Sequence, residues 1–458
     1  MSRFVQVDRD TAYLLPPSVQ EWLPKDHLAR YVVDVVEALD LSVLVRQYAG
    51  RGSDAHHPGT LLALLIYGCA TGVHASRAIE RASHDSVAFR FVAGNTHPDH
   101  DTIATFRRRF ADQIKALFVQ VLQIAQANGL LKLGKVALDG TKVKANASRH
   151  SALSHGHALK LKQQLQAEVE TLLRLAEAAD TSERPEGMNI PQELARREQR
   201  LARIEEAKAQ IEAAAAQDYE QAQAQFEAKQ TERERRKNEG GRRPPGPPPT
   251  PPSSEVDPKA QVNLTDADSR IMKVSAQGFE QCYNAQLAVD MDSRLIVAPG
   301  LTQAVNDKQQ IVPMLERLRA LPPELGTVQA LVTDNGFMSE ANVRACAMPE
   351  AEGAAAIAPL IALGREPHHA DLMQRFAPEL FGPPPPDPVQ AMAHRLKTAQ
   401  GRALYALRKS TVEPVIGIIK SVMKFRQFLL RGVNLVSGEW DLVCLAYNVK
   451  RMHRMQGT

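Results

Sequence analysis

The sequence predicts an α/β protein in which a mixed sheet follows a helical N-terminal region and is interrupted by an inserted helical hairpin. Residues 1–128 place apolar side chains at helical spacings, and residues 130–150 and 259–458 contain short apolar runs that end at turns. Residues 155–238 are instead dominated by Ala, Gln, Glu, Lys and Arg. A chain of 458 residues has the length of two or three domains.

The composition is that of an ordinary globular protein, with 44% hydrophobic and 24% charged residues, which excludes a wholly disordered chain. The longest apolar stretch, residues 60–73, is shorter than the roughly 20 residues of a membrane-spanning helix, so no membrane partner is expected. The charged N-terminus predicts no export signal. The four cysteines form no CxxC pair, which predicts neither a disulfide framework nor a zinc ribbon, and favours the reducing cytoplasm.

The charge is unevenly distributed. The net charge is +4, but residues 391–458 contain 12 Lys and Arg against three acidic residues. A basic end on an otherwise slightly acidic chain indicates a polyanionic partner, with nucleic acid as the first candidate.

In the N-terminal region, one apolar stripe predicts a helix over residues 103–124, with Asp99 among its candidate N-caps and Asn128-Gly129 as its end. Residues 58–81 predict a helix pair broken near Gly72. Two further stripes, over 161–176 and 194–215, predict an antiparallel hairpin, and the proline-rich residues 242–258 predict an extended linker. We interpret 155–258 as an insertion.

The remaining elements define the sheet. Strands are expected at 135–138, 283–290, 294–299, 328–333 and 354–358, and a helix follows Asp307 with its apolar face at 311–318. The first strand is expected to end in a turn at Asp139-Gly140.

Two of these strands lead directly into an aspartate and a glycine-containing turn. Asp139 follows the first strand, and Asp334 follows the strand at 328–333. Because reactive groups in open α/β sheets lie beyond the carboxyl ends of the strands, the two carboxylates converge if these strands are neighbours. Ordinary turn chemistry is the alternative explanation for each aspartate.

A third carboxylate, Glu413, lies in the sequence Thr411-Val412-Glu413-Pro414, which we expect to open a helix. The spacing places Glu413, Gly417, Lys420 and Lys424 on one helical face, which suits a divalent metal beside a phosphate backbone. A solvated amphipathic helix, with Glu413 interacting with the helix dipole, is the alternative.

At these positions the sequence resembles bacterial insertion-sequence transposases of the DDE class. Three blocks carry the resemblance: Leu138 to Ser148, Thr333 to Phe337, and Tyr405 to Lys420 followed by Phe425 to Gly432. Asn263 to Arg270, Tyr283 to Gln286, and the N-terminal Pro98 to Arg107 also resemble segments of this family.

The resemblance implies a ribonuclease H-like catalytic core at 130–150 and 259–458, and a helical domain at 1–128 for binding DNA ends or for assembly. It implies a catalytic and metal-binding triad of Asp139, Asp334 and Glu413. Carboxylates favour Mg²⁺, with Mn²⁺ as a substitute, and two such ions suit phosphodiester chemistry. The implied reaction is cleavage at the ends of the element, followed by transfer of the freed 3′-hydroxyl into target DNA.

The implied partners are DNA and further copies of the chain, in a homodimer or larger synaptic assembly, in the bacterial cytoplasm and on the nucleoid. Basic residues near the blocks are expected to contact phosphates: Lys142, Lys144, Arg402, Arg408, Lys409, Lys420, Lys424, Arg426 and Arg431. Surface solubility explains any one of them equally well. Arg107, Arg108 and Arg109 are expected either to contact DNA ends or to line a solvated helix face.

Two other functions fit the same residues. One is a related metal-dependent nuclease that cuts without joining. The other is a non-catalytic DNA-binding or scaffold protein that acts through helices in 1–128 and 155–238.

Overall fold

The computed structural model describes residues 18–48, 55–178, 189–240, 248–274, 278–347, 355–364 and 382–457. Part of the predicted linker, residues 242–247, and Ala354 of the predicted last strand lie outside them. The chain divides into two compact units, one formed by 1–143 with 283–458 and the other by 144–282.

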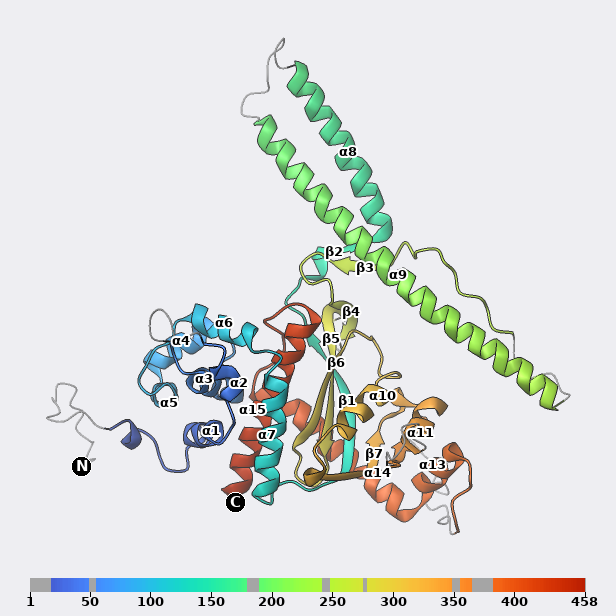
Figure 1. Cartoon of the computed structure of the whole chain (residues 1–458). Helices are drawn as coiled ribbons and strands as arrows, with labels where there is room; N and C mark the ends of the chain where they lie inside the picture. Colours follow the sequence, from blue (N-terminus) through green and yellow to red (C-terminus); the bar gives the residue numbers. More distant parts are fainter. Residues whose placement is uncertain are drawn as a thin grey trace, which may run out of the picture. The chain divides into compact units, whose positions relative to one another are not determined.

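The first unit begins with a group of helices (Figure 1). They are α1 (Leu28–Glu37), α2 (Ser42–Val45), α3 (Pro58–Thr71), α4 (Ser76–Asp85), α5 (Val87–Val92), α6 (His100–Arg109) and α7 (Ile114–Ala127), after a 3-10 turn at Val19–Glu21. The predicted break near Gly72 is confirmed, since Gly72 ends α3 with φ 84°. Asp99 caps α6 by accepting the Thr102 N–H at 2.8 Å, also as predicted.

The prediction of one helix over 103–124 is wrong. The stripe is shared by α6 and α7, which are separated at residues 110–113. Both halves keep their apolar face buried, with Ile103 and Phe106 in α6 and Leu117 and Val121 in α7. A break that preserves the buried face leaves no trace in the hydrophobic spacing.

The sheet of this unit has the order β5-β1-β7-β8, with β6 on the other side of β5. The strands are β1 (Leu133–Lys144), β5 (Gly278–Asp290), β6 (Ile296–Thr302), β7 (Gly326–Thr333) and β8 (Ala358–Ile361). β1 pairs with β7 and β7 with β8 in parallel, whereas β5 and β6, two strands that the sequence predicted, pair antiparallel. The sheet is therefore mixed, as the sequence predicted.

The later helices of the first unit pack against strands of this sheet (Figure 1). They are α10 (Ile311–Arg319), α11 (Glu340–Ala347), α13 (Pro388–Lys397), α14 (Ala399–Gly417) and α15 (Val433–Gln456), with 3-10 turns at Pro323–Leu325 and Asn335–Phe337 and a π-helical turn at Ile418–Val422. α10 and α15 contact β6, α14 contacts β7, and α11 and α13 contact β8.

Helix α15 is the centre of the first unit. It also contacts α3, α7 and α1, and its middle is buried on all sides. Asn448 accepts the Ile296 N–H and donates to the Ile296 carbonyl, both at 2.8 Å, and so pairs two backbone groups of β6. Trp440 donates to the Gln286 carbonyl at 3.2 Å and contacts Phe425 and Phe428.

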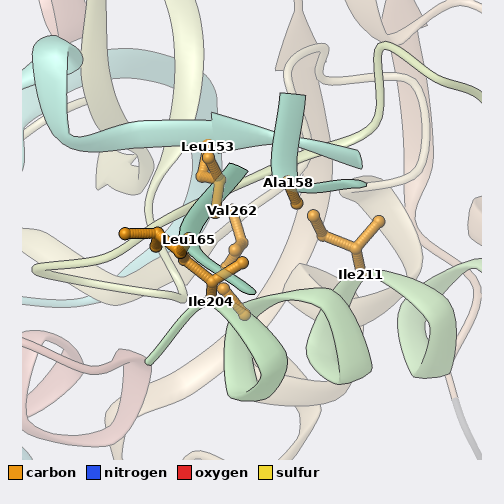
Figure 2. Close-up of a cluster of buried hydrophobic side chains, with 7 residues drawn as sticks. Leu153, Ala158, Leu165, Ile204, Ile211 and Val262 are labelled. Carbon is orange, nitrogen blue, oxygen red and sulfur yellow. The ribbon is translucent and has the colours of Figure 1, made fainter. Parts of the chain in front are cut away.

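The second unit contains the helical hairpin. α8 (His155–Ala178) and α9 (Ile190–Gly240) contact each other, next to β2 (Ala152–Ser154) paired antiparallel with β3 (Gln261–Asn263); β4 (Arg270–Val274) pairs with the first residues of β5. Figure 2 shows the apolar cluster that joins α8, α9, β2 and β3, which includes Leu153, Leu165, Ile204 and Val262. The predicted hairpin is confirmed, although α9 extends to Gly240, beyond its predicted stripe.

Among the described residues, no single helix is long and apolar enough to cross a membrane, and α3 and α4 meet such a criterion only as a pair bent by 94°.

The buried carboxyl of Asp441 in α15 makes a prediction about stability. Burial raises its pKa to about 7, against the effect of the Arg317 and Lys115 cations, and its Oδ1 has no hydrogen-bond partner. The unfolded chain releases this proton near pH 4, whereas the folded chain keeps it until about pH 7. The free energy of unfolding should therefore fall as the pH rises between these values, by roughly 2–4 kcal/mol.

Asp441→Asn, which is neutral at every pH, should lack this fall. Urea unfolding of both proteins at pH 5, 6, 7 and 8 measures the difference between the two slopes. Parallel curves for the wild type and the variant would contradict the prediction.

Candidate active site

The parallel pairing of β1 with β7 brings two of the predicted acids together. Leu138 is paired with Thr333, so Asp139 and Asp334 each come one residue after a paired position. The preceding residues of both strands are buried, which fixes the register through the sheet core. The condition that the sequence left open, that these two strands are neighbours, is met in the structure.

The two aspartates differ in their backbone setting. Asp334 follows the end of β7, and its Oδ1 accepts the Gly336 N–H at 2.8 Å at the start of a 3-10 turn. Asp139 lies inside β1, and its Oδ1 accepts the Gly140 N–H at 2.8 Å. The predicted turn at Asp139-Gly140 is thus wrong, because β1 continues to Lys144.

The helix that carries Glu413 begins earlier than predicted. α14 starts after Thr398, whose side chain accepts the Gly401 N–H at 3.0 Å, so Glu413 lies near the C-terminal end and not in the first turn. Pro414 is inside the helix. Proline at this point marks where the helix becomes irregular, because it removes one N–H from the ladder.

A π-helical turn, Ile418–Val422, follows directly. The predicted common face of Glu413, Gly417, Lys420 and Lys424 is therefore interrupted. The wider turn rotates the residues after 417, and Lys424 has a left-handed φ of 58°.

Arg408 of α14 connects Glu413 to the first aspartate. Its guanidinium lies 3.3 Å from Asp139 Oδ2 through Nη1 and 3.6 Å from Glu413 Oε1 through Nη2. The Arg408 side chain is 9% exposed and that of Asp139 18%, whereas that of Glu413 is 54% exposed. One buried cation thus lies between two of the three predicted acids.

The electrostatics of Asp139 show that acids converge at this point. Burial, and then the neighbouring Asp334 carboxylate, raise the pKa of Asp139 to about 6. Arg408 and the Gly140 N–H oppose the shift, and Asp307 adds to it. Like charges brought together in a partly buried site favour either protons or cations.

The residues offer a donor set that suits a hard divalent cation, since all three are carboxylates. Within the described ranges, however, no three His, Cys, Asp or Glu side chains are grouped closely enough to hold a metal ion as they stand. The Arg408 guanidinium occupies the position of a counterion between Asp139 and Glu413.

Two segments of the chain match models of known protein families. Residues 17–109 match the model of a transposase domain (DUF772), and residues 386–453 match that of a transposase DDE domain. The two matches support an insertion-sequence DDE transposase, a family that acts on DNA. No curated protein and no solved structure matches the chain significantly.

The DDE-domain match includes Glu413, Arg408 and Lys420 but neither aspartate. Asp139 and Asp334 lie outside both matches, and the structure adds for them the register of β1 with β7. The match to the N-terminal transposase domain covers α1 to α6.

The DNA-binding residues predicted from the sequence differ in their exposure and in their contacts. Lys409, Lys424, Arg426 and Arg431 are exposed. Lys420 instead donates to Thr141 Oγ1 at 2.5 Å and to the Lys142 carbonyl at 2.9 Å, and Lys144 is paired with Glu280 at 3.3 Å. Lys142 is half-buried, Arg402 is exposed, and Arg408 is directed at carboxylates.

The three arginines of α6 also differ from one another. Arg107 is buried and donates to the His74 carbonyl at 2.5 Å. Arg109 donates to the Gln47 carbonyl at 2.5 Å and lies over the Tyr48 ring. Arg108 is exposed, and so is Arg109, whereas Arg107 is not.

Sequence reasoning missed a polar group behind Gly140. Asn284 and Gln286 of β5 both donate to Asp307 Oδ1 at 2.7 Å. The sequence placed Asp307 at the start of α10, but the N-cap of α10 is Gln310 and Asp307 faces β5 instead. Two buried amides at alternate positions of an apolar strand were the available signal, because alternate residues share one face.

Gly140 has no room for a side chain. A Cβ at this position would lie 2.4 Å from Asp307 Oδ1 and 2.5 Å from Gln286 Nε2. The β1 backbone therefore approaches this polar group closely, immediately after Asp139.

Gly140→Ala should displace β1 beside Asp139, lowering DNA cleavage at least about tenfold and stability by roughly 1–3 kcal/mol. Gly134→Ala is the matched control, since it lies in the same strand with nothing within 4 Å of its Cβ. DNA cleavage rates and urea unfolding of both variants provide the measurement. Wild-type cleavage by Gly140→Ala would show that this close approach does not position Asp139.

Proposed function

We propose that this protein is a transposase that cleaves DNA at the ends of its insertion sequence, with divalent metal ions, and joins the freed 3′-hydroxyl to target DNA. The observation that carries the proposal is the β1–β7 register, which sets Asp139 beside Asp334, together with Arg408, which links Asp139 to Glu413. The transposase-domain matches support the same conclusion.

We propose a ribonuclease H-like core for this activity. The support is a mixed sheet in which the parallel strands β1 and β7 are neighbours, Asp139 lies within β1, Asp334 follows β7, and Glu413 is on α14, a helix that contacts β7. The three carboxylates thus come from three elements, β1, β7 and α14. Sites in α/β sheets commonly lie at the carboxyl ends of the strands.

Asp139, Asp334 and Glu413 are the residues that would hold the metal, two Mg²⁺ ions or Mn²⁺ in their place. Such ions, when bound, supply activation of the attacking oxygen and stabilisation of charge at the scissile phosphate. Carboxylates fit this function better than His or Cys, because Mg²⁺ prefers hard oxygen ligands. Asp139 serves as a ligand in its ionised form, as carboxylate ligands do.

The reaction then needs two attacks at one site. Water attacks the phosphate at the element's end and frees a 3′-hydroxyl, and this hydroxyl attacks a phosphate of the target. Each attack exchanges one oxygen on phosphorus for another, so no Ser or Tyr nucleophile is required.

The chain's remaining contribution is to hold the DNA. Lys409, Lys424, Arg426 and Arg431 are exposed in or after the helix that bears Glu413, where they would contact the phosphate backbone and make binding sensitive to salt. Because two element ends and a target must be brought together, we propose that the protein acts as a dimer or a larger assembly.

Asp139→Asn, Asp334→Asn and Glu413→Gln should each lower DNA cleavage at least about a hundredfold, because each removes a ligand charge while leaving the shape of the side chain. DNA binding, measured by mobility shift, should be retained. Glu316→Gln, an exposed neutralisation on α10, is the control and should cleave normally. Normal cleavage by any one of the three variants removes that residue from the triad.

Joining is tested separately with precut ends. The wild-type protein, given DNA ends that already carry a free 3′-hydroxyl, should insert them into a plasmid when Mg²⁺ is present. A protein that cleaves intact ends but never joins precut ones is a nuclease. A protein that neither cleaves nor joins DNA, and whose DNA binding is unchanged by the triad substitutions, is a scaffold.

A further inference from the structure

The cation between Asp139 and Glu413 is loosely held. Its two contacts, at 3.3 and 3.6 Å, use one guanidinium nitrogen each and are longer than the roughly 2.7–2.9 Å of a well-formed charged hydrogen bond. Its third nitrogen, Nε, is buried and has no hydrogen-bond partner. Arg408 therefore makes weaker contacts than a buried arginine with a purely structural role would be expected to make.

The position of Arg408 has an electrostatic explanation. Asp139 is buried next to Asp334, with Asp307 nearby, and Arg408 is the cation that lowers the pKa of Asp139. An arginine remains charged at any relevant pH, so it compensates the acids continuously.

A divalent ion would compete for the same oxygens. Asp139 Oδ2 and Glu413 Oε1, which Arg408 contacts, belong to the proposed ligands. A guanidinium and a divalent ion bound to the same carboxylates would also repel each other strongly in a partly buried site. Binding of a divalent ion to these oxygens should therefore weaken their contacts with Arg408.

We propose that Arg408 is a displaceable counterion, which holds Asp139 and Glu413 in the metal-free protein and must move aside when a divalent ion binds. This inference rests on the proposed function of Asp139 and Glu413 as metal ligands. It makes Arg408 a positioning residue, because it acts through the two carboxylates.

The displacement couples metal binding to DNA binding. A guanidinium released from carboxylates needs another anion, and a DNA phosphate is a matching bidentate partner. Metal should therefore bind weakly to the free protein and more tightly when DNA is present, and DNA binding should tighten reciprocally in the presence of metal. The sequence-based expectation that Arg408 contacts DNA then describes the second of its two positions.

The test is a Mn²⁺ titration of the full-length protein without DNA, with free Mn²⁺ measured by electron paramagnetic resonance. Arg408→Gln should bind Mn²⁺ roughly tenfold more tightly than the wild type, because the competing charge is gone. Lys409→Gln is the matched control, since it removes an exposed positive charge from the same helix, and it should change the affinity less than about twofold. Unchanged or weaker binding by Arg408→Gln overturns the proposal.

Asp139→Asn separates this inference from the proposed function. If it lowers Mn²⁺ affinity while Arg408→Gln does not raise it, the metal site stands and the counterion inference fails. If Asp139→Asn binds Mn²⁺ like the wild type, the proposed metal site itself is wrong, and the inference falls with it.

A second measurement uses the wild-type chain and does not depend on a folded variant. Arg408 is 8% exposed, so phenylglyoxal, which modifies accessible guanidinium groups, should react with it slowly. Saturating Mn²⁺ should increase the modification of Arg408 several-fold, measured by peptide mass spectrometry against the exposed Arg426 as reference. Equal modification of Arg408 with and without Mn²⁺ contradicts the displacement.

Discussion

Two neighbouring strands that run in the same direction, each continuing into an aspartate, create a repulsion that the surrounding structure has to accommodate. Asp139 and Asp334 are held close by the register of β1 and β7, and that register is itself held by the buried residues before them. Burial and then this repulsion raise the pKa of Asp139, and the guanidinium of Arg408 lies against the same carboxylate. The site is organised by negative charge that the protein alone compensates only in part, which is the condition under which cations bind.

The parts of the first unit that hold these charges in place are largely apolar. α15 is buried along its middle, and Trp440 joins it to Phe425 and Phe428, the aromatic residues that follow the π-helical turn. Glu439 of the same helix accepts the Leu429 and Leu430 N–H groups at 3.0–3.1 Å. The segment that follows Glu413 is thus anchored to the central helix, so the position of the third acid depends on packing far from it along the chain.

Much of the fold follows from the sequence, since hydrophobic spacing predicted strands β1, β5, β6 and β7, the helix pair at α3 and α4, and the inserted hairpin. It did not predict β4, and it placed the last strand at 354–358, before the observed β8. The failures have local physical causes. Proline is common in the first turn of a helix, so Pro414 was interpreted as a helix start. In the structure α14 begins directly after Thr398, and Pro414 lies near its C-terminal end. A proline alone therefore does not show which end of a helix it is near. Asp139-Gly140 resembles a turn sequence, but Gly140 instead lets the β1 backbone come close to the side chains of Asp307 and Gln286. The sequence predicted that Asp139 and Asp334 would meet if their strands were neighbours, and β1 and β7 are neighbours. The inward direction of Arg408 depends on tertiary contacts that no spacing encodes.

Asn448 has a consequence for how copies of this protein can associate. β6 pairs with β5 on one side only among the described strands, and the backbone of an unpaired strand edge commonly recruits a strand from another molecule. At Ile296, the carboxamide of Asn448 already satisfies both backbone groups, as a neighbouring strand would. An intermolecular sheet continuing through this point would first have to expel a buried side chain, so contacts between copies should form through helices or loops and not by extension of the sheet there.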